Sequence, residues 1–125
     1  MKRNKVKLSG NSEIEFYIDE QNKDNIINFL GDKGVEKLRY IFSRICKGKP
    51  PKDVYSSENY DNSIQNITAI KFKGSQFNNA RIYCKDYNEG KSRIIVLSEL
   101  LESKKQNKLT QKIKNLITKV NDYDY

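Results

Sequence analysis

Apolar residues alternate with polar ones near the start of the chain and predict its first strand. Ile14, Phe16 and Ile18 occupy every second position between residues 13 and 19. A period of two is typical of a strand that buries one of its faces. We therefore expect a half-buried strand over residues 13–19.

The apolar positions that follow have a helical spacing and predict two helices. The first runs from about residue 21 to residue 30 and ends at Gly31. The second runs from about residue 33 to residue 47, where the i, i+3, i+4, i+7 spacing aligns the apolar side chains on one stripe. Gly48 and the two prolines after residue 49 stop this helix.

Three further strands are predicted in succession, over residues 66–73, 80–85 and 93–100. The last of them is apolar on both faces, which indicates a central strand. Alternation along the other two separates the side chains into an apolar face and a face that carries positive charge and tyrosine. The apolar face holds Ile70, Phe72, Ile82 and Cys84, and the opposite face, expected to be exposed, holds Lys71, Lys73, Arg81, Tyr83 and Lys85.

The end of the chain predicts one more helix, which Thr110 caps and which runs to about residue 122. These elements together predict an α+β fold. We expect a small twisted antiparallel sheet of about four strands, packed against two N-terminal helices and one C-terminal helix. A single domain should span residues 1–125, with a basic tail over residues 1–11 and a long polar loop over residues 50–65.

The net charge of +8 arises from 24 lysine and arginine residues against 16 acidic residues, and it is unevenly distributed. Residues 1–65 carry a net charge of +2 and residues 66–125 a net charge of +6. Six lysines and no acid lie between Ser103 and Val120. Such a field favours a polyanion, either a nucleic acid or an acidic protein, although a solvated basic face is also compatible with it.

Several function classes lack the residues they need. The chain has no histidine, which excludes Ser-His-Asp and Cys-His catalysis and histidine-bound metals. Neither a P-loop nor a G-x-G-x-x-G sequence occurs, so we expect no cofactor and no metal. Cys46 and Cys84 read as structural thiols. We see no signal peptide and no membrane span, and we expect a cytoplasmic protein with no membrane partner.

Lysine, arginine and tyrosine remain as the chemistry, and this set suits a phosphodiester backbone. Arginine grips phosphate with a rigid fork of donors, and lysines close to one another repel, which lowers their pKa. A neutral lysine can take a proton from a ribose 2′-OH, so such a site would cleave RNA and spare DNA. Structural roles are the alternatives. They are an ion pair between Arg81 and an acid such as Glu99, protection of a sheet edge by Lys71 and Lys73, and packing of the last helix by Tyr123 and Tyr125.

Short segments in a fixed order carry a resemblance to a known family. They are the strand Ile14–Tyr17, two helices, the strand motif Arg81-Ile82-Tyr83, the strand Ile94–Leu97 leading into Lys104-Lys105-Gln106, and a closing helix ending in Asp122-Tyr123. Together they resemble the RelE/ParE superfamily of type II toxin-antitoxin toxins, nearest to its HigB/RelE-like branch. The resemblance covers most of residues 12–125 and rests on their order.

That resemblance implies a ribosome-dependent mRNA endonuclease that grips mRNA and 16S rRNA and is silenced by a small antitoxin, for which a helix-turn-helix protein is one candidate. Arg81 would lie at the scissile phosphate with Lys71, Lys73 and Tyr123 as further catalytic residues. The expected RNA-binding residues are Tyr83, Lys85, Lys104, Lys105, Lys108 and Lys112.

The chain departs from the family pattern in length, in the missing proline after the lysine pair and in the missing C-terminal histidine of some members. The general acid is therefore not assigned by the resemblance. The leading hypothesis is a metal-independent mRNA interferase. The alternatives are a ParE-like inhibitor of DNA gyrase and a noncatalytic module that binds nucleic acid or protein.

Overall fold

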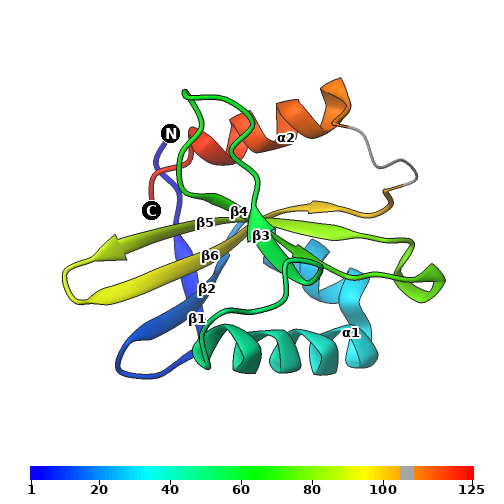
Figure 1. The fold of residues 1–125 in the computed structure, drawn as a ribbon, viewed down its shortest axis with the longest axis horizontal. Coiled ribbons are helices and arrows are strands. Elements are labelled where there is room, and N and C mark those ends of the chain that lie inside the picture. Colours follow the sequence, from blue (N-terminus) through cyan, green and yellow to red (C-terminus); the bar gives the residue numbers. More distant parts are fainter. Residues whose placement is uncertain (105–108) are drawn as a thin grey trace.

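The protein is an α+β structure in which a mixed sheet of six strands lies between two helices (Figure 1). The computed structural model describes residues 1–104 and 109–125. Helix α1 spans Lys23–Cys46 and covers one face of the sheet, and helix α2 spans Gln111–Asn121 and covers the other. The prediction of an α+β fold is confirmed, but its count of about four strands and three helices is wrong.

The sheet has the strand order β1-β2-β6-β5-β4-β3. Strand β2 runs parallel to β6, and every other neighbouring pair is antiparallel, so the sheet is mixed where a purely antiparallel one was predicted. The four predicted strands are present, and β6 is central as its apolar sequence indicated. The strands are β1 Lys5–Gly10, β2 Ile14–Asp19, β3 Tyr55–Ser57, β4 Ile67–Lys71, β5 Arg81–Glu89 and β6 Ser92–Leu101.

The two additional strands occupy segments that were predicted to be irregular. Strand β1 forms within the expected basic tail and pairs with β2 along one edge of the sheet. Strand β3 forms within the expected loop over residues 50–65 and pairs with β4 along the other edge. Both predictions are wrong, for different reasons. In β1, Val6 and Leu8 alternate with polar residues and pack against the core, which is a strand pattern that the basic composition concealed. Strand β3 has only three residues and forms through its backbone hydrogen bonds to β4, without an alternating pattern of its own.

Helix α1 combines the two predicted N-terminal helices into one element with a break at Gly31. Gly31 has φ 61° and ψ −169°, a conformation that favours glycine because a β-carbon would be strained there. The break therefore falls where the first helix was expected to end. Beyond it, the apolar stripe of the second segment turns onto the sheet, and Leu38, Ile41 and Ile45 are buried.

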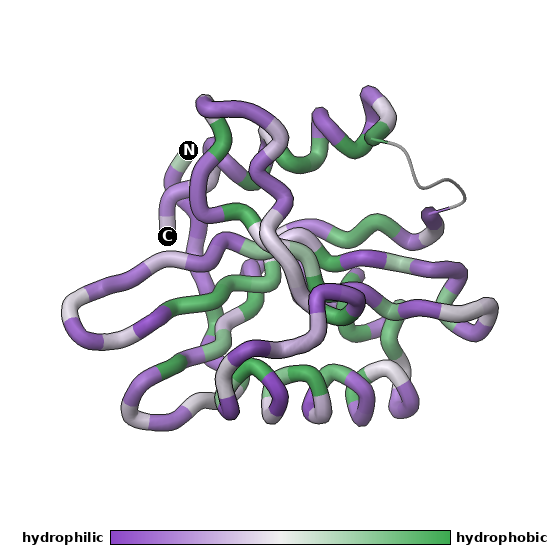
Figure 2. Tube along the Cα trace, in the orientation of Figure 1, coloured by the Kyte–Doolittle hydropathy of each residue, from purple (hydrophilic) through white to green (hydrophobic). Residues whose placement is uncertain are grey.

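The core between α1 and the sheet is built from the predicted apolar faces of helix and strands. Phe16 of β2 stacks on Phe42 of α1, with ring centroids 3.9 Å apart and planes 12° from parallel. Ile82 and Cys84 of β5 are fully buried on the same side. Figure 2 shows apolar residues along β6 and on the side of α1 that faces the sheet.

A second core lies on the opposite face, beneath α2. Ile117 and Val120 of the helix pack with Ile67 and Tyr83 of the strands, and all four are fully buried. The predicted cap is confirmed, since the Thr110 hydroxyl accepts a hydrogen bond from the Ile113 N–H at 3.3 Å. The expectation of a wholly exposed cationic face is wrong, because α2 covers much of it.

The first and last residues of the chain lie side by side and bind one another (Figure 1). The Arg3 N–H donates to the Asp124 carbonyl at 2.8 Å. The Arg3 guanidinium makes two hydrogen bonds, of 2.7 and 2.8 Å, to the fully buried carboxylate of Asp19. It also lies 4.0 Å from the centre of the Tyr123 ring. Arg3, which lies in the predicted basic tail, is thus a buried part of the fold.

Within the described residues, no helix is both long and apolar enough to cross a membrane.

Replacing Arg3 with methionine should lower the free energy of unfolding by about 3–5 kcal/mol, because the carboxylate of Asp19 would stay buried without its cation. Urea denaturation followed by circular dichroism measures this loss. Lys2→Met is the matched control, since Lys2 is exposed, and it should change the stability little. An equal loss in the two variants would contradict the role assigned to the buried pair.

The difference in stability between the wild type and Arg3→Met should depend on pH. Burial raises the pKa of Asp19, but hydrogen bonds from Arg3, Tyr125 and the Asn22 N–H outweigh burial, and the pKa lies below its ordinary value. The contribution of the pair to stability is therefore present above the pKa of an unfolded aspartate, about 3.9, and is lost as the pH falls through the lower pKa of the folded state. The stability difference between wild type and Arg3→Met should shrink on acidification.

Candidate active site

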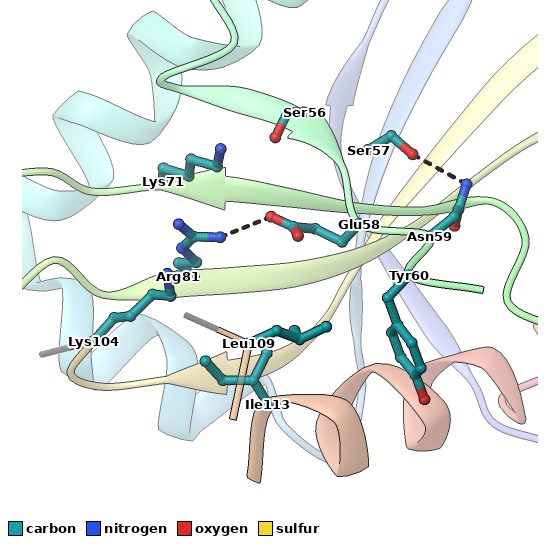
Figure 3. A pocket seen from close by; sticks show the side chains of 10 residues that line it. All are labelled: Ser56, Ser57, Glu58, Asn59, Tyr60, Lys71, Arg81, Lys104, Leu109 and Ile113. Atoms are coloured by element: carbon teal, nitrogen blue, oxygen red, sulfur yellow. Dashed lines mark hydrogen bonds and ion pairs between the residues drawn. The ribbon is translucent and has the colours of Figure 1, made fainter. Parts of the chain in front are cut away.

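A pocket of about 360 Å³ opens on the α2 side of the sheet, beside the ends of β3, β4, β5 and β6 (Figure 3). One wall is polar and charged, and the other is apolar and aromatic. The lining residues are Ser56, Ser57, Glu58, Asn59, Tyr60, Lys71, Arg81, Lys104, Leu109 and Ile113. Three of the predicted site residues, Lys71, Arg81 and Lys104, are therefore brought together.

The sheet register explains how these three cations meet. Lys71 ends β4 and Arg81 begins β5, and the two residues are direct antiparallel partners. Lys104 follows the end of β6, where its N–H donates to the Asn78 carbonyl at 3.0 Å. Residues directly opposite each other on paired strands place their side chains on the same face of the sheet, so Lys71 and Arg81 project into the same space.

Glu58 supplies the negative charge in the pocket. It directly follows β3, and its N–H donates to the Ile67 carbonyl at 2.9 Å, which extends the pairing of β3 with β4. Its carboxylate accepts a 2.7 Å hydrogen bond from the Arg81 guanidinium. The side chains of Arg81 and Glu58 are 19% and 17% exposed, so the ion pair is only partly screened by water. The predicted alternative of a pair between Arg81 and Glu99 is wrong.

Both lysines of the pocket have a lowered pKa. Partial burial of the Lys71 ammonium is the main cause, and the positive charge of Arg81 lowers the pKa further. Lys104 is affected in the same way, first by burial, then by Arg81 and more weakly by Lys71. Glu58 acts in the opposite direction on both lysines. A lysine with a lowered pKa releases its proton more readily near neutral pH than an ordinary lysine does.

The remaining wall of the pocket offers an apolar and aromatic surface. Tyr60 is anchored by a 2.9 Å hydrogen bond between its hydroxyl and that of Thr118 on α2. Leu109 precedes α2 and is 39% exposed, and Ile113 lies in its first turn. Surfaces of this kind accept the flat face of a nucleobase, whereas the charged wall accepts a phosphate.

Three other predicted cations, Lys73, Lys85 and Lys112, lie outside the pocket lining. Lys73 follows β4, is 61% exposed and lies 3.9 Å from the Asp53 carboxylate. Lys112 is exposed on α2. The Lys85 ammonium donates to the carbonyls of Asn121, at 3.0 Å, and Tyr123, so it holds the end of α2 to the sheet. Lys105 and Lys108 lie outside the described residues.

The two predicted tyrosines are buried in the second core and are not available to stack on RNA. Tyr83 is fully buried, and Tyr123 is 1% exposed. The Tyr123 hydroxyl donates to the Glu99 carboxylate, and this contact together with Arg3 fixes the ring beneath α2. The packing alternative for Tyr123 is therefore the arrangement found in the structure, and this residue does not line the pocket with Arg81.

Sequence reasoning missed Glu58 and its neighbours Ser57, Asn59 and Tyr60. They lie in a polar stretch that has no periodicity, where one acidic residue looks like any solvated surface carboxylate. The only local signal was the apolar pair Val54-Tyr55, which marks the start of β3. The face on which Glu58 lies depends on the pairing of β3 with β4, and one sequence does not reveal that register.

The geometry combines a carboxylate, a guanidinium and two ammonium groups around one small space. The three cations can hold a phosphate, and Glu58 can accept a proton from a group bound next to it. Among residues 1–104 and 109–125, no three cysteine, aspartate or glutamate side chains are grouped as metal ligands would be. No protein-family model, curated protein or solved structure matches the chain.

Removing either charge of the Arg81–Glu58 pair should move the pKa values of the pocket lysines in opposite directions. Arg81→Gln removes a positive neighbour and should raise the pKa of Lys71 and Lys104, whereas Glu58→Gln removes a negative neighbour and should lower both. NMR titration of the lysine side chains measures these shifts.

Lys85 is the internal control for that titration. Burial lowers its pKa too, but the charges acting on it are those of Asp122 and Asp124, and not those of the pocket. Its titration should stay constant in both variants. Shifts of the same sign in Arg81→Gln and Glu58→Gln would refute the charge arrangement described for the pocket.

Proposed function

We propose that the protein is a toxin-type endoribonuclease that cleaves translated mRNA on the ribosome by attack of a ribose 2′-OH. The observation that carries the proposal is the pocket in which Glu58 pairs with Arg81 between Lys71 and Lys104. Cleavage of RNA by this route needs a base, a site for the charged phosphate and an acid. The pocket contains a group suited to each role.

In the proposed reaction, the Glu58 carboxylate removes the proton from the 2′-OH, and the 2′-oxygen forms a bond to phosphorus. Arg81 and Lys71 stabilise the additional negative charge on the phosphate oxygens. The bond from phosphorus to the 5′-oxygen breaks, and the Lys104 ammonium protonates that oxygen. The products are a 2′,3′-cyclic phosphate and a 5′-hydroxyl, and DNA is not a substrate because it lacks the attacking group.

Glu58 replaces lysine as the base in this scheme because its carboxylate is the acidic group among the residues that line the pocket. Lys104 is assigned as the acid because the Lys71 ammonium already donates to the Lys52 carbonyl at 3.0 Å. The lowered pKa of Lys104 suits a proton donor.

The resemblance to RelE/ParE toxins supports the choice of substrate. The order on which it rests, a strand, a helical pair, three antiparallel strands and a closing helix, corresponds to β2, the kinked α1, β4–β6 and α2. The proposed partners are therefore the ribosome with its 16S rRNA and a cognate antitoxin, for which a helix-turn-helix protein is one candidate. The proposed site of action is the cytoplasm. The net charge of +8 supports an RNA target.

Arg81→Gln and Glu58→Gln should each reduce the cleavage of translated mRNA by at least about a hundredfold, the usual loss when a catalytic base or a transition-state contact is removed. Cleavage is measured by mapping 5′ ends after induced expression and in a translation extract. Arg39→Gln and Glu36→Gln are the matched controls, because both residues are exposed on α1. Both control variants should cleave as the wild type does.

The outcomes also separate the alternatives. Intact mRNA together with DNA breaks would favour a gyrase inhibitor. Intact mRNA with harmless expression, and with RNA binding that weakens steeply as salt is added, would indicate a noncatalytic module. Either result would overturn the proposed activity.

The assignment of Lys104 as the acid has its own test. Lys104→Ala should cleave ordinary RNA slowly but should recover most of the wild-type rate on RNA with a sulfur in place of the scissile 5′-oxygen, because a thiolate leaves without protonation. Lys71→Ala should stay slow on both substrates, since its role is charge stabilisation. Recovery in Lys71→Ala alone would exchange the two roles.

A further inference from the structure

The hydroxyl of Tyr83 is buried and has no hydrogen-bond partner among the described residues. The residue is fully buried in the core beneath α2. An unpaired buried hydroxyl destabilises a fold relative to phenylalanine at the same position, and native proteins keep few of them. Where such a hydroxyl lies next to a charged group, its oxygen is an acceptor that the charged group can use in another state of the protein.

Tyr83 lies next to the Arg81–Glu58 pair. It follows Arg81 by two positions in β5, so both side chains project to the α2 face of the sheet. Its ring belongs to the same packed cluster as Ile113, which lines the pocket. Burial raises the pKa of Tyr83 to about 12, the charge of Glu58 raises it as well, and Arg81 lowers it through its charge and through a side-chain contact with the hydroxyl. The guanidinium therefore already lies beside the hydroxyl, although no contact of full hydrogen-bond geometry joins the two.

The proposed reaction requires the Arg81–Glu58 pair to separate. A carboxylate bound to a guanidinium at 2.7 Å is a poor proton acceptor, and the same guanidinium must turn towards the phosphate. When Arg81 separates from Glu58, the guanidinium loses one hydrogen bond. A neutral acceptor next to Arg81 can replace that bond without competing for the proton of the 2′-OH.

We propose that Tyr83 is a positioning residue whose hydroxyl oxygen accepts a hydrogen bond from Arg81 when RNA is bound, and so releases Glu58 to act as the base. The proposal rests on the proposed RNase activity. In the resting protein Arg81 is held by Glu58, and in the complex it is held by Tyr83 and the phosphate. The unpartnered hydroxyl is thus the cost of keeping an acceptor ready beneath the pocket.

Tyr83→Phe is expected to affect stability and activity in opposite directions. Removing the unpaired hydroxyl should raise the midpoint of thermal unfolding. The same change should lower kcat for RNA cleavage about ten- to one-hundredfold, the effect of one hydrogen bond to a charged group. The affinity for an RNA whose scissile 2′-OH is replaced by hydrogen should stay within about twofold, because Lys71 and Lys104 still hold the phosphate.

Tyr87→Phe is the matched control. The Tyr87 hydroxyl is also buried without a partner in the described part of the chain, but Tyr87 pairs with Ile94 near the far end of β5 from Arg81. This variant should gain thermal stability in the same way and should keep the wild-type kcat. The pair of variants therefore separates a general effect of an unpaired hydroxyl from a specific effect at the pocket.

The results distinguish failure of this inference from failure of the proposed activity. If the wild type cleaves RNA and Tyr83→Phe cleaves it equally fast, the role of Tyr83 is wrong and the activity stands. An equal loss of kcat in Tyr83→Phe and Tyr87→Phe would also overturn the role. If the wild type leaves RNA intact in the translation extract, the activity is wrong, and the role of Tyr83 falls with it.

Discussion

The structure depends on burying both faces of strand β6. Residues 94–97 are buried without interruption, so the sheet must be covered on each side. Helix α1 covers one side through its stripe of apolar residues, and α2 has to cover the other. That requirement decides the position of the pocket: α2 buries the middle of the cationic face, and only its margin, where β4 and β5 carry Lys71 and Arg81, stays accessible.

Polar contacts hold α2 in this position. Lys85 binds carbonyls at the end of the helix, Tyr123 binds Glu99, and Arg3 binds Asp19 while lying against the Tyr123 ring. Lys85, predicted to bind RNA, and Tyr123, predicted to be catalytic, therefore stabilise the fold. A basic or aromatic residue on the polar face of a strand can face either solvent or a helix packed over that face. The alternation along the strand does not distinguish these two environments.

The sequence predicted the elements that have a local pattern better than the contacts between elements. Period-two alternation identified β2, β4 and β5, and a continuous apolar run identified β6. Helical spacing identified α2 and the two segments of α1, and the glycine between these segments marked the break, because each of these features depends on a local pattern. Strand β1 carries the same alternation at Val6 and Leu8 and pairs with the next strand in sequence, but it was read as part of a basic tail. The short strand β3 and the parallel pairing of β2 with β6 have no such local pattern and were missed. In the site, Lys71 and Arg81 were found together because they share a hairpin, whereas Glu58 reaches them through the register of β3, which no local pattern encodes.

Glu58 also balances part of the positive charge in the pocket. Lys71, Arg81 and Lys104 would repel one another in a space of about 360 Å³ if no anion lay among them. The carboxylate balances part of that charge in the resting protein, and an incoming phosphate can take over the same role. A phosphate would therefore both occupy the cationic wall and weaken the hold of Arg81 on Glu58. In the proposed reaction, binding of the substrate and release of Glu58 as the base would therefore be one event. A second partner for Arg81 would then matter to the chemistry and not only to the fold.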